Sequence, residues 1–178
     1  MKIICFGDSN TYGYDPRGYF GGQYDSPWPD ILAAKTGWNV VNEGMNGREL
    51  PETQVLFPAD ADLLIIMLGT NDLLRFGTPE NTCEKMERFM ESIILARDKI
   101  LLIAPPPMKF GEWVPDQELI ENSVTLAKYY KALAERLGIQ FADAGKWSVP
   151  LAYDGVHLTE EGHKAFAQGL IEYLQKGD

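Results

Sequence analysis

Five short segments of the chain are almost continuously apolar and rich in branched or aromatic side chains. Polar and apolar residues do not alternate in them, as they would in a strand with one face in water. The pattern therefore predicts strands that are buried on both faces of a parallel sheet. The expected strands are Lys2–Gly7, Trp38–Asn42, Asp62–Leu68, Lys99–Ala104 and Gln140–Ala142.

Helical patterns separate these strands. Between Cys83 and Ile93, apolar residues recur three or four positions apart and form one stripe on a helix. Thr78-Pro79 provides a start signal for that helix, Gly138 a stop signal for the next one, and Thr159 a cap for the last. The expected helices are Trp28–Thr36, Glu80–Asp98, Asp116–Leu137 and Thr159–Gln175.

Alternating strands and helices of this kind predict right-handed βαβ units and an α/β fold of three layers, α/β/α. In such a sheet, functional groups gather where the strands end. Four polar segments are expected to share that edge, three of them directly after strands and the fourth at the end of a longer loop. They are Gly7–Asn10, Asn42–Gly47, Gly69–Asp72 and Asp154–His157.

Length and composition are those of one ordinary globular domain, which we expect to span residues 1–178. Hydrophobic residues make up 45% of the chain and charged residues 24%. The formal net charge is −10, which disfavours binding to nucleic acids and to anionic membrane surfaces. A small-molecule substrate is the expected partner.

The cysteines and the start of the chain favour a cytoplasmic location. Of the two cysteines, Cys5 lies in an apolar run and is expected to be a buried small hydrophobe. The apolar run after Met1-Lys2 is too short for a signal peptide and has no cleavage site behind it. No apolar stretch reaches the length of a membrane span.

Ser9 has two possible roles. After Gly7-Asp8 at a strand end, its hydroxyl could project into a cleft as a nucleophile, or it could cap the next helix. The chain lacks Gly-x-Ser-x-Gly, which excludes the nucleophile elbow of the α/β-hydrolases.

A nucleophilic serine needs a base, and the chain contains two histidines. His157 follows Asp154 by three residues, so one short segment could hold an imidazole and the carboxylate that orients it. His163 lies inside a predicted helix and is expected to be a packed or solvated residue.

Acyl transfer also needs donors for the developing oxyanion. Asn71 offers a side-chain amide at the end of the third strand, and Gly47 offers a backbone N–H in a loop. Each also has a simpler explanation, an Asn-Asp turn for Asn71 and an ordinary loop glycine for Gly47. Together with Ser9 and Asp154–His157 at the same edge of the sheet, the set indicates an acyl-transfer site.

In order along the chain, these residues resemble the four sequence blocks of the SGNH (GDSL-like) hydrolases. The blocks are Gly7-Asp8-Ser9, Gly47, Gly69-x-Asn71-Asp72 and Asp154-x-x-His157. The resemblance implies a flavodoxin-like sheet of order 2-1-3-4-5, a serine esterase, and no metal or organic cofactor. It implies Ser9 as nucleophile and His157 as base, oriented by Asp154. The implied oxyanion hole comprises the backbone N–H groups of Ser9 and Gly47 and the Asn71 amide.

Within that family the chain looks most similar to bacterial arylesterases, which act on short acyl groups and can be oligomeric. This likeness is carried by residues 5–9, 65–72, 105–107 and 141–145. Two positions depart from the common pattern. Asn10 stands in place of Leu, and Tyr12, an expected wall of the substrate pocket, stands in place of Trp.

Three alternatives remain open. A metallophosphoesterase could use Asp8, Asp72, Asp154 and His157, although dinuclear sites usually recruit more histidines than two. A flavodoxin-like binding module would keep the strand-end loops without catalysis. A carbohydrate O-acetylesterase could stack sugar rings on the aromatic residues. The same residues could instead close a small apolar acyl pocket, or could equally form the core and a lid. These residues are Tyr12, Tyr14, Tyr19, Phe20, Tyr24, Trp28 and Trp113.

Overall fold

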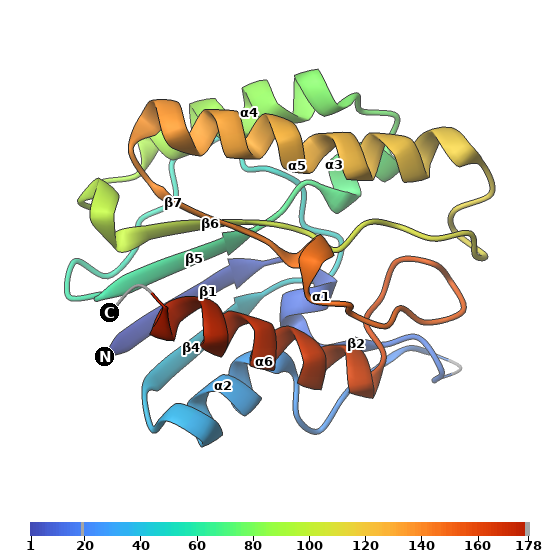
Figure 1. Ribbon diagram of the computed structural model, residues 1–178, viewed down its shortest axis with the longest axis horizontal. Coiled ribbons are helices and arrows are strands. Elements are labelled where there is room, and N and C mark those ends of the chain that lie inside the picture. Colours follow the sequence, from blue (N-terminus) through green and yellow to red (C-terminus); the bar gives the residue numbers. More distant parts are fainter. Residues whose placement is uncertain (19, 177–178) are drawn as a thin grey trace.

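A five-stranded parallel sheet forms the centre of the protein (Figure 1). The computed structural model describes residues 1–18 and 20–176. The spatial order of the strands is β4-β1-β5-β6-β7, which is 2-1-3-4-5 when the five are counted along the chain, as expected. The strands are β1 (Lys2–Gly7), β4 (Asn39–Gly44), β5 (Leu63–Met67), β6 (Ile100–Ala104) and β7 (Gln140–Asp143).

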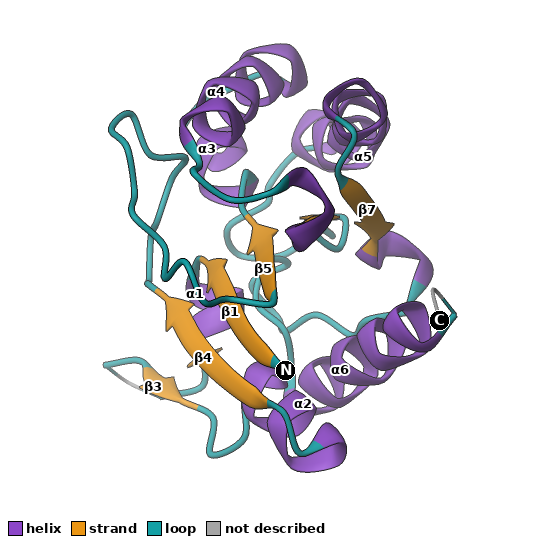
Figure 2. Ribbon diagram, turned by 90° about the vertical axis from the view of Figure 1, so that its left-hand side faces the viewer, coloured by secondary structure: helices purple, strands orange, loops and turns teal. Residues whose placement is uncertain are grey.

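Two pairs of helices cover the two faces of this sheet (Figure 2). On one face α4 (Pro79–Ser92) packs beside α5 (Gln117–Leu137), and on the other α2 (Trp28–Thr36) packs beside α6 (Glu160–Gln175). Each face has its own apolar core, because successive side chains of the buried strands point to opposite sides of the sheet. The predicted three-layer α/β/α architecture is confirmed.

The helix boundaries follow the predicted signals at most ends. Thr159 accepts a hydrogen bond from the backbone of Gly162 and caps α6. The prediction is wrong at the end of α4, which stops at Ser92 and not at Asp98. Ile93 has an extended backbone there and is buried in the core, while Arg97 donates to the Met90 carbonyl near the helix end. Burial of Ile93 thus outweighs continuation of the helix.

Short elements that the hydrophobic pattern did not predict lie where the sheet strands end. Helix α1 (Ser9–Tyr12) follows β1, and α3 (Thr70–Leu74) follows β5. A small hairpin joins β2 (Tyr14–Asp15) to β3 (Gly22–Gln23). Figure 1 shows α1 and β2 at the edge to which the sheet arrows point. These elements carry the polar side chains described below.

Cys5 lies in β1 and is fully buried, as expected, whereas Cys83 is half-buried on α4. Both are free thiols, and burial raises the pKa of Cys5 far above its usual range. Among the residues described, no helix combines the length and the apolar character needed to cross a membrane.

Candidate active site

Ser9, His157 and Asp154 form a continuous hydrogen-bonded line. The Ser9 hydroxyl oxygen lies 2.9 Å from Nε2 of His157, and Nδ1 of the same ring lies 2.6 Å from Oδ2 of Asp154. All three side chains are buried, and 148 positions in the sequence separate the serine from the histidine. The fold therefore brings together the hydroxyl, imidazole and carboxylate that the sequence singled out.

The hydrogen bonds define where the imidazole carries its proton. An ionised carboxylate can only accept, so Nδ1 of His157 must be the N–H that donates to Asp154. In the neutral ring, Nε2 is then left with a lone pair facing the Ser9 hydroxyl. This tautomer can accept the proton of Ser9.

The backbone of the segment that carries His157 holds Asp154 in place. Its Oδ1 accepts hydrogen bonds from the backbone N–H groups of Val156 and His157, each 2.9 Å long. Burial by itself raises the pKa of the Asp154 carboxyl, but the hydrogen bonds from the His157 side chain and these two backbone groups outweigh it. The net pKa is lowered, which keeps the carboxylate charged at neutral pH.

Ser9 is the first residue of α1 and does not cap that helix. Asp8 is the cap, since its carboxylate accepts a 2.9 Å hydrogen bond from the backbone of Asn10. The interpretation of Ser9 as a capping serine is therefore wrong. Burial raises the pKa of Asp8 to about 6, against the lowering effects of the Asn10 hydrogen bond and the charges of His157 and Arg48.

Asn71 and Gly47 lie close to Ser9 and His157. The Asn71 amide nitrogen donates a 3.0 Å hydrogen bond to the carbonyl of Arg48, the residue after Gly47. An amide nitrogen carries two hydrogens, so one remains for another acceptor. Asn71 lies in the first turn of α3, so it does not form the simple Asn-Asp turn considered for it. Gly47 has φ +71°, a conformation that glycine adopts without strain.

A small cavity of about 190 Å³ joins these groups. The rings of Tyr14 and Trp113 flank the His157 imidazole, with centroid separations of 4.6 and 5.0 Å. The residues that line the cavity are Ser9, Tyr14, Asn46, Gly47, Asn71, Trp113 and His157.

Among the described residues Tyr12 does not line this cavity, contrary to its expected place in the pocket wall. The reason is the turn at Gly13, where φ is +94° and α1 ends. After this turn, Tyr14 and not Tyr12 packs against the imidazole. The Tyr12 carbonyl instead accepts a hydrogen bond from Gln23 of the hairpin.

His163 is a packed histidine, one of the two roles expected for it. It is fully buried in α6, and its Nδ1 accepts a 3.2 Å hydrogen bond from the backbone of Trp28. Burial, followed by the charge of His157, lowers its pKa to about 4. His163 therefore stays neutral at physiological pH and takes no part in the line from Ser9 to Asp154.

Comparison with known proteins identifies the family. Residues 5–165 match the model of the GDSL-like Lipase/Acylhydrolase family. The chain belongs to this family. It is accordingly an esterase or acylhydrolase, a carboxylic ester hydrolase.

Relatives cover the length of the chain. The structure of the M. smegmatis aryl esterase is 26% identical, covers 98% of both chains and has a TM-score of 0.81. A carbohydrate acetylesterase family member from Sinorhizobium meliloti is 27% identical over 98% of this chain and 97% of its own, with a TM-score of 0.83. An isoamyl acetate-hydrolyzing esterase 1 homolog from Bos taurus is 23% identical over 98% of this chain and 82% of its own.

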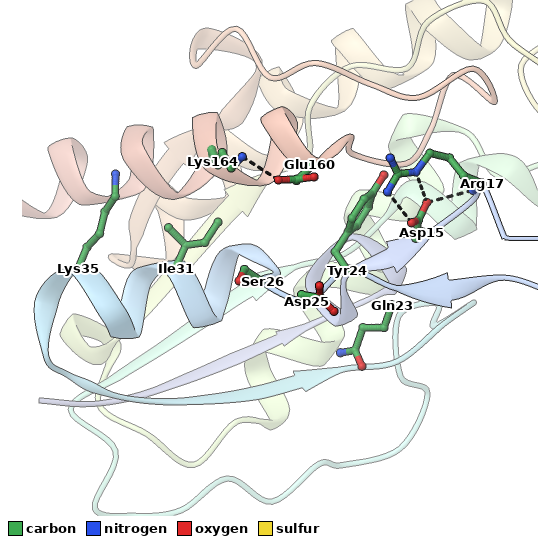
Figure 3. A pocket seen from close by; sticks show the side chains of 10 residues that line it. All are labelled: Asp15, Arg17, Gln23, Tyr24, Asp25, Ser26, Ile31, Lys35, Glu160 and Lys164. Atoms are coloured by element: carbon green, nitrogen blue, oxygen red, sulfur yellow. Dashed lines mark hydrogen bonds and ion pairs between the residues drawn. The ribbon is translucent and has the colours of Figure 1, made fainter.

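A larger cavity, of about 600 Å³, lies elsewhere on this acylhydrolase (Figure 3). It is lined by charged side chains that are largely paired, such as Arg17 with Asp15 and Lys164 with Glu160. Neither Ser9 nor His157 lines it, although Asp15 is the strand neighbour of Tyr14. The smaller cavity therefore holds the groups suited to ester chemistry.

The geometry does not favour the metallophosphoesterase alternative. Asp72 accepts from Lys85 and from the backbone of Leu50, while Asp8 caps α1 and Asp154 holds His157. In the part of the chain that the structure describes, no three His, Cys, Asp or Glu side chains are grouped to hold a metal ion. Each of these carboxylates thus has its own hydrogen-bond partners within the fold.

Sequence reasoning missed several residues of the site. The residue types give no signal for a role of Asn46 or Arg48. Tyr14 and Trp113, by contrast, are among the aromatic residues expected to contact a sugar or to close an acyl pocket, and both line the cavity. Trp113 reaches the cavity because residues 109–113 hydrogen-bond with 153–155, including Trp113 N–H to the Asp154 carbonyl at 3.0 Å. No local pattern could have revealed this pairing. Tyr19, also named among the aromatic residues, lies outside the described residues.

Proposed function

We propose that this GDSL-like acylhydrolase is a serine esterase that hydrolyses short-chain, acetyl-type esters through an acyl-enzyme on Ser9. The supporting observation is the buried line from Ser9 through His157 to Asp154, with hydrogen bonds of 2.9 and 2.6 Å. It offers a nucleophile, a base in the accepting tautomer, and a charged group that stabilises the imidazolium.

In the first half of the reaction, His157 Nε2 removes the proton as Ser9 Oγ attacks the ester carbonyl carbon. The oxyanion receives hydrogen bonds from the backbone N–H groups of Ser9 and Gly47 and from the Asn71 amide. When the intermediate collapses, the carbon–oxygen bond to the alcohol breaks, and His157 donates its proton to that alcohol. Water then hydrolyses the acyl-enzyme with His157 as base again.

The cavity favours a short acyl group. Its volume is about 190 Å³, and the rings of Tyr14 and Trp113 line it where they pack against the His157 imidazole. Relatives named for aryl esters and for isoamyl acetate agree with a small acyl group joined to an apolar alcohol. We further propose a small-molecule substrate, since the net charge of −10 disfavours nucleic acids and anionic membranes.

A second candidate is a carbohydrate O-acetylesterase. The S. meliloti neighbour is described as a carbohydrate acetylesterase family member. Trp113 of the cavity is 46% exposed, and the exposed rings of Phe110 and Tyr153 lie in the two segments that hydrogen-bond beside it. Aromatic faces of this kind suit sugar rings. Comparing kcat/KM on acetylated xylan with that on an aryl acetate separates the two candidates.

The serine mechanism is tested with Ser9→Ala and His157→Ala. We expect each to lower kcat on an aryl acetate by about 10⁴-fold or more without unfolding the protein. A fluorescent organophosphonate should label the wild-type protein at Ser9, as located by peptide mass spectrometry, and should not label Ser9→Ala. Ser26→Ala, at an exposed serine of the larger cavity, is the matched control and should keep activity and labelling. Full activity of Ser9→Ala would refute the proposal.

A further inference from the structure

Asn10, which directly follows Ser9, joins the beginning of the chain to the segment that carries His157. Its Nδ2 donates a 3.1 Å hydrogen bond to the Val156 carbonyl, and its Oδ1 accepts a 2.9 Å hydrogen bond from the backbone N–H of Leu158. Both ends of one side-chain amide are used, and Asn10 is only 3% exposed. The two bonds span 146 and 148 positions in the sequence.

The two backbone groups that Asn10 binds lie on either side of His157. One belongs to the residue before the histidine and the other to the residue after it. Asn10 therefore fixes the backbone from which the imidazole projects. Since Asn10 is also bonded covalently to Ser9, the link between nucleophile and base passes through one residue and two hydrogen bonds.

Each end of this link is itself held. The backbone N–H of Asn10 donates to Asp8, which fixes the first turn of α1. On the other side, Asp154 accepts from the backbone of Val156 and His157 and from the imidazole. Asp154 thus orients the imidazole ring of His157, whereas Asn10 holds the backbone of His157 at its distance from Ser9.

A leucine side chain at this position could make neither hydrogen bond. A leucine here would leave a buried carbonyl at Val156 and a buried N–H at Leu158 without the partner they have now, which is costly in a dry interior. We propose that Asn10 is a positioning residue that holds His157 within hydrogen-bond distance of Ser9. This inference rests on the proposed Ser9–His157 mechanism.

The test uses Asn10→Leu and Asn10→Ala, assayed on an aryl acetate. We expect kcat to fall about 10- to 100-fold, because a displacement of the order of 1 Å in a reacting group costs that much. KM should stay within about twofold, since Asn10 does not line the cavity among the residues described. The rate constant for labelling of Ser9 by an organophosphonate should fall by the same factor as kcat. The alanine side chain is smaller than that of asparagine, so the alanine variant can be assayed if the leucine variant does not fold.

A double-mutant cycle with His157→Ala separates positioning from a general structural effect. If Asn10 acts through the imidazole, its replacement in the His157→Ala protein should cause no further loss of the residual kcat. An equal further loss there would overturn the proposal, as would a folded Asn10 variant with kcat within twofold of wild type.

Thr78→Ala is the matched control for stability. It removes the cap hydrogen bond to Asn81 N–H at the start of α4, away from the cavity, and should lower Tm while leaving kcat unchanged. A parallel fall in kcat for this control would also count against the proposal. Active Ser9→Ala or His157→Ala proteins would reject the serine mechanism, whereas inactive ones beside fully active Asn10 variants would reject only the positioning role.

Discussion

At the scale of single residues, the chemistry depends on which nitrogen of His157 carries the hydrogen. Asp154 enforces the Nδ1–H form because a carboxylate can only accept. The consequence is that Asp154 matters for the direction of the hydrogen bonds as well as for its charge. This separates its role from that of an ordinary ion-pair partner.

Asp154→Asn should therefore lower kcat by about 10⁴-fold while the fold is kept. The new amide can donate to Nδ1, which leaves the hydrogen on Nε2 facing the Ser9 hydroxyl, the wrong arrangement for a base. Steady-state kinetics on an aryl acetate, with circular dichroism for the fold, measure this. Asp143→Asn, in the turn where Asp143 accepts from Gly145 N–H, is the control and should keep kcat. An Asp154→Asn protein within tenfold of wild type would contradict the tautomer argument.

Asn71→Ala should act on kcat and leave KM nearly unchanged. The amide is proposed to bind negative charge that exists only in the transition state, so its loss should cost about 3 kcal/mol, or 100- to 1,000-fold in kcat. The Arg48 carbonyl would also lose its 3.0 Å partner. The measurement is kcat and KM on one aryl acetate. A raised KM with an unchanged kcat would instead show that Asn71 binds the ground state of the substrate.

At the scale of elements, the strands were predictable because β1, β5 and β6 are buried along nearly their whole length. Their sequences are almost entirely apolar, as this environment requires. The hairpin of β2 and β3 has only two residues in each strand, which is too short for a pattern of apolar and polar residues to indicate a strand. Its position follows from contacts with distant residues, such as the Pro16 carbonyl with the Tyr153 hydroxyl. The pocket wall was therefore assigned to Tyr12, although the turn at Gly13 brings Tyr14 there.

The connection from β5 to α3 depends on Gly69. Its φ is +117°, and a Cβ added there would lie 2.5 Å from the hydroxyl of Tyr130, which donates to the Leu68 carbonyl. Gly69→Ala should lower the free energy of unfolding by about 2–5 kcal/mol, the sum of left-handed strain and overpacking. It should also lower kcat, because α3 carries Asn71. Urea denaturation and kinetics on the same variant measure both.

Gly138→Ala is the matched control for that substitution. Gly138 ends α5 with φ +65°, and an added Cβ would meet no atom within 4 Å. Only the strain of the left-handed backbone remains, about 1–2 kcal/mol, and kcat should not change. Equal losses of stability in the two variants would show that the contact with Tyr130 is not important.

At the scale of the whole molecule, the site joins residues near both ends of the chain. The ordered blocks were recognisable in the sequence because each keeps its own residue types at the end of a strand or a loop. The link through Asn10 was not, since its partners are the backbone carbonyl of Val156 and the backbone N–H of Leu158, which leave no trace in residue identity. The segment that carries Trp113 to the cavity is likewise held by backbone hydrogen bonds, including that from Trp113 N–H to the Asp154 carbonyl. Contacts to the backbone across the fold are therefore the part of the site that sequence reasoning could not supply.

The pH dependence of stability tests the packing between α2 and α6, where His163 is buried. Its folded pKa is about 4, against an ordinary value of 6.5, so between these pH values the unfolded chain binds a proton that the folded protein does not. Acid therefore destabilises the fold through His163, by about 3 kcal/mol on going from pH 7 to pH 4. Asp8 acts in the opposite direction, because its folded pKa is raised to about 6 from 3.8.

Because these two effects offset each other in the wild type, the test compares variants. The difference in free energy of unfolding between wild type and His163→Gln should shift by about 3 kcal/mol in favour of the variant as pH falls from 7 to 4. For Asp8→Asn the shift should have the opposite sign. Urea denaturation at several pH values measures both differences. A difference for His163→Gln that does not change with pH would mean that the imidazole is already accessible to protons in the folded protein. Water would then enter the packing between α2 and α6.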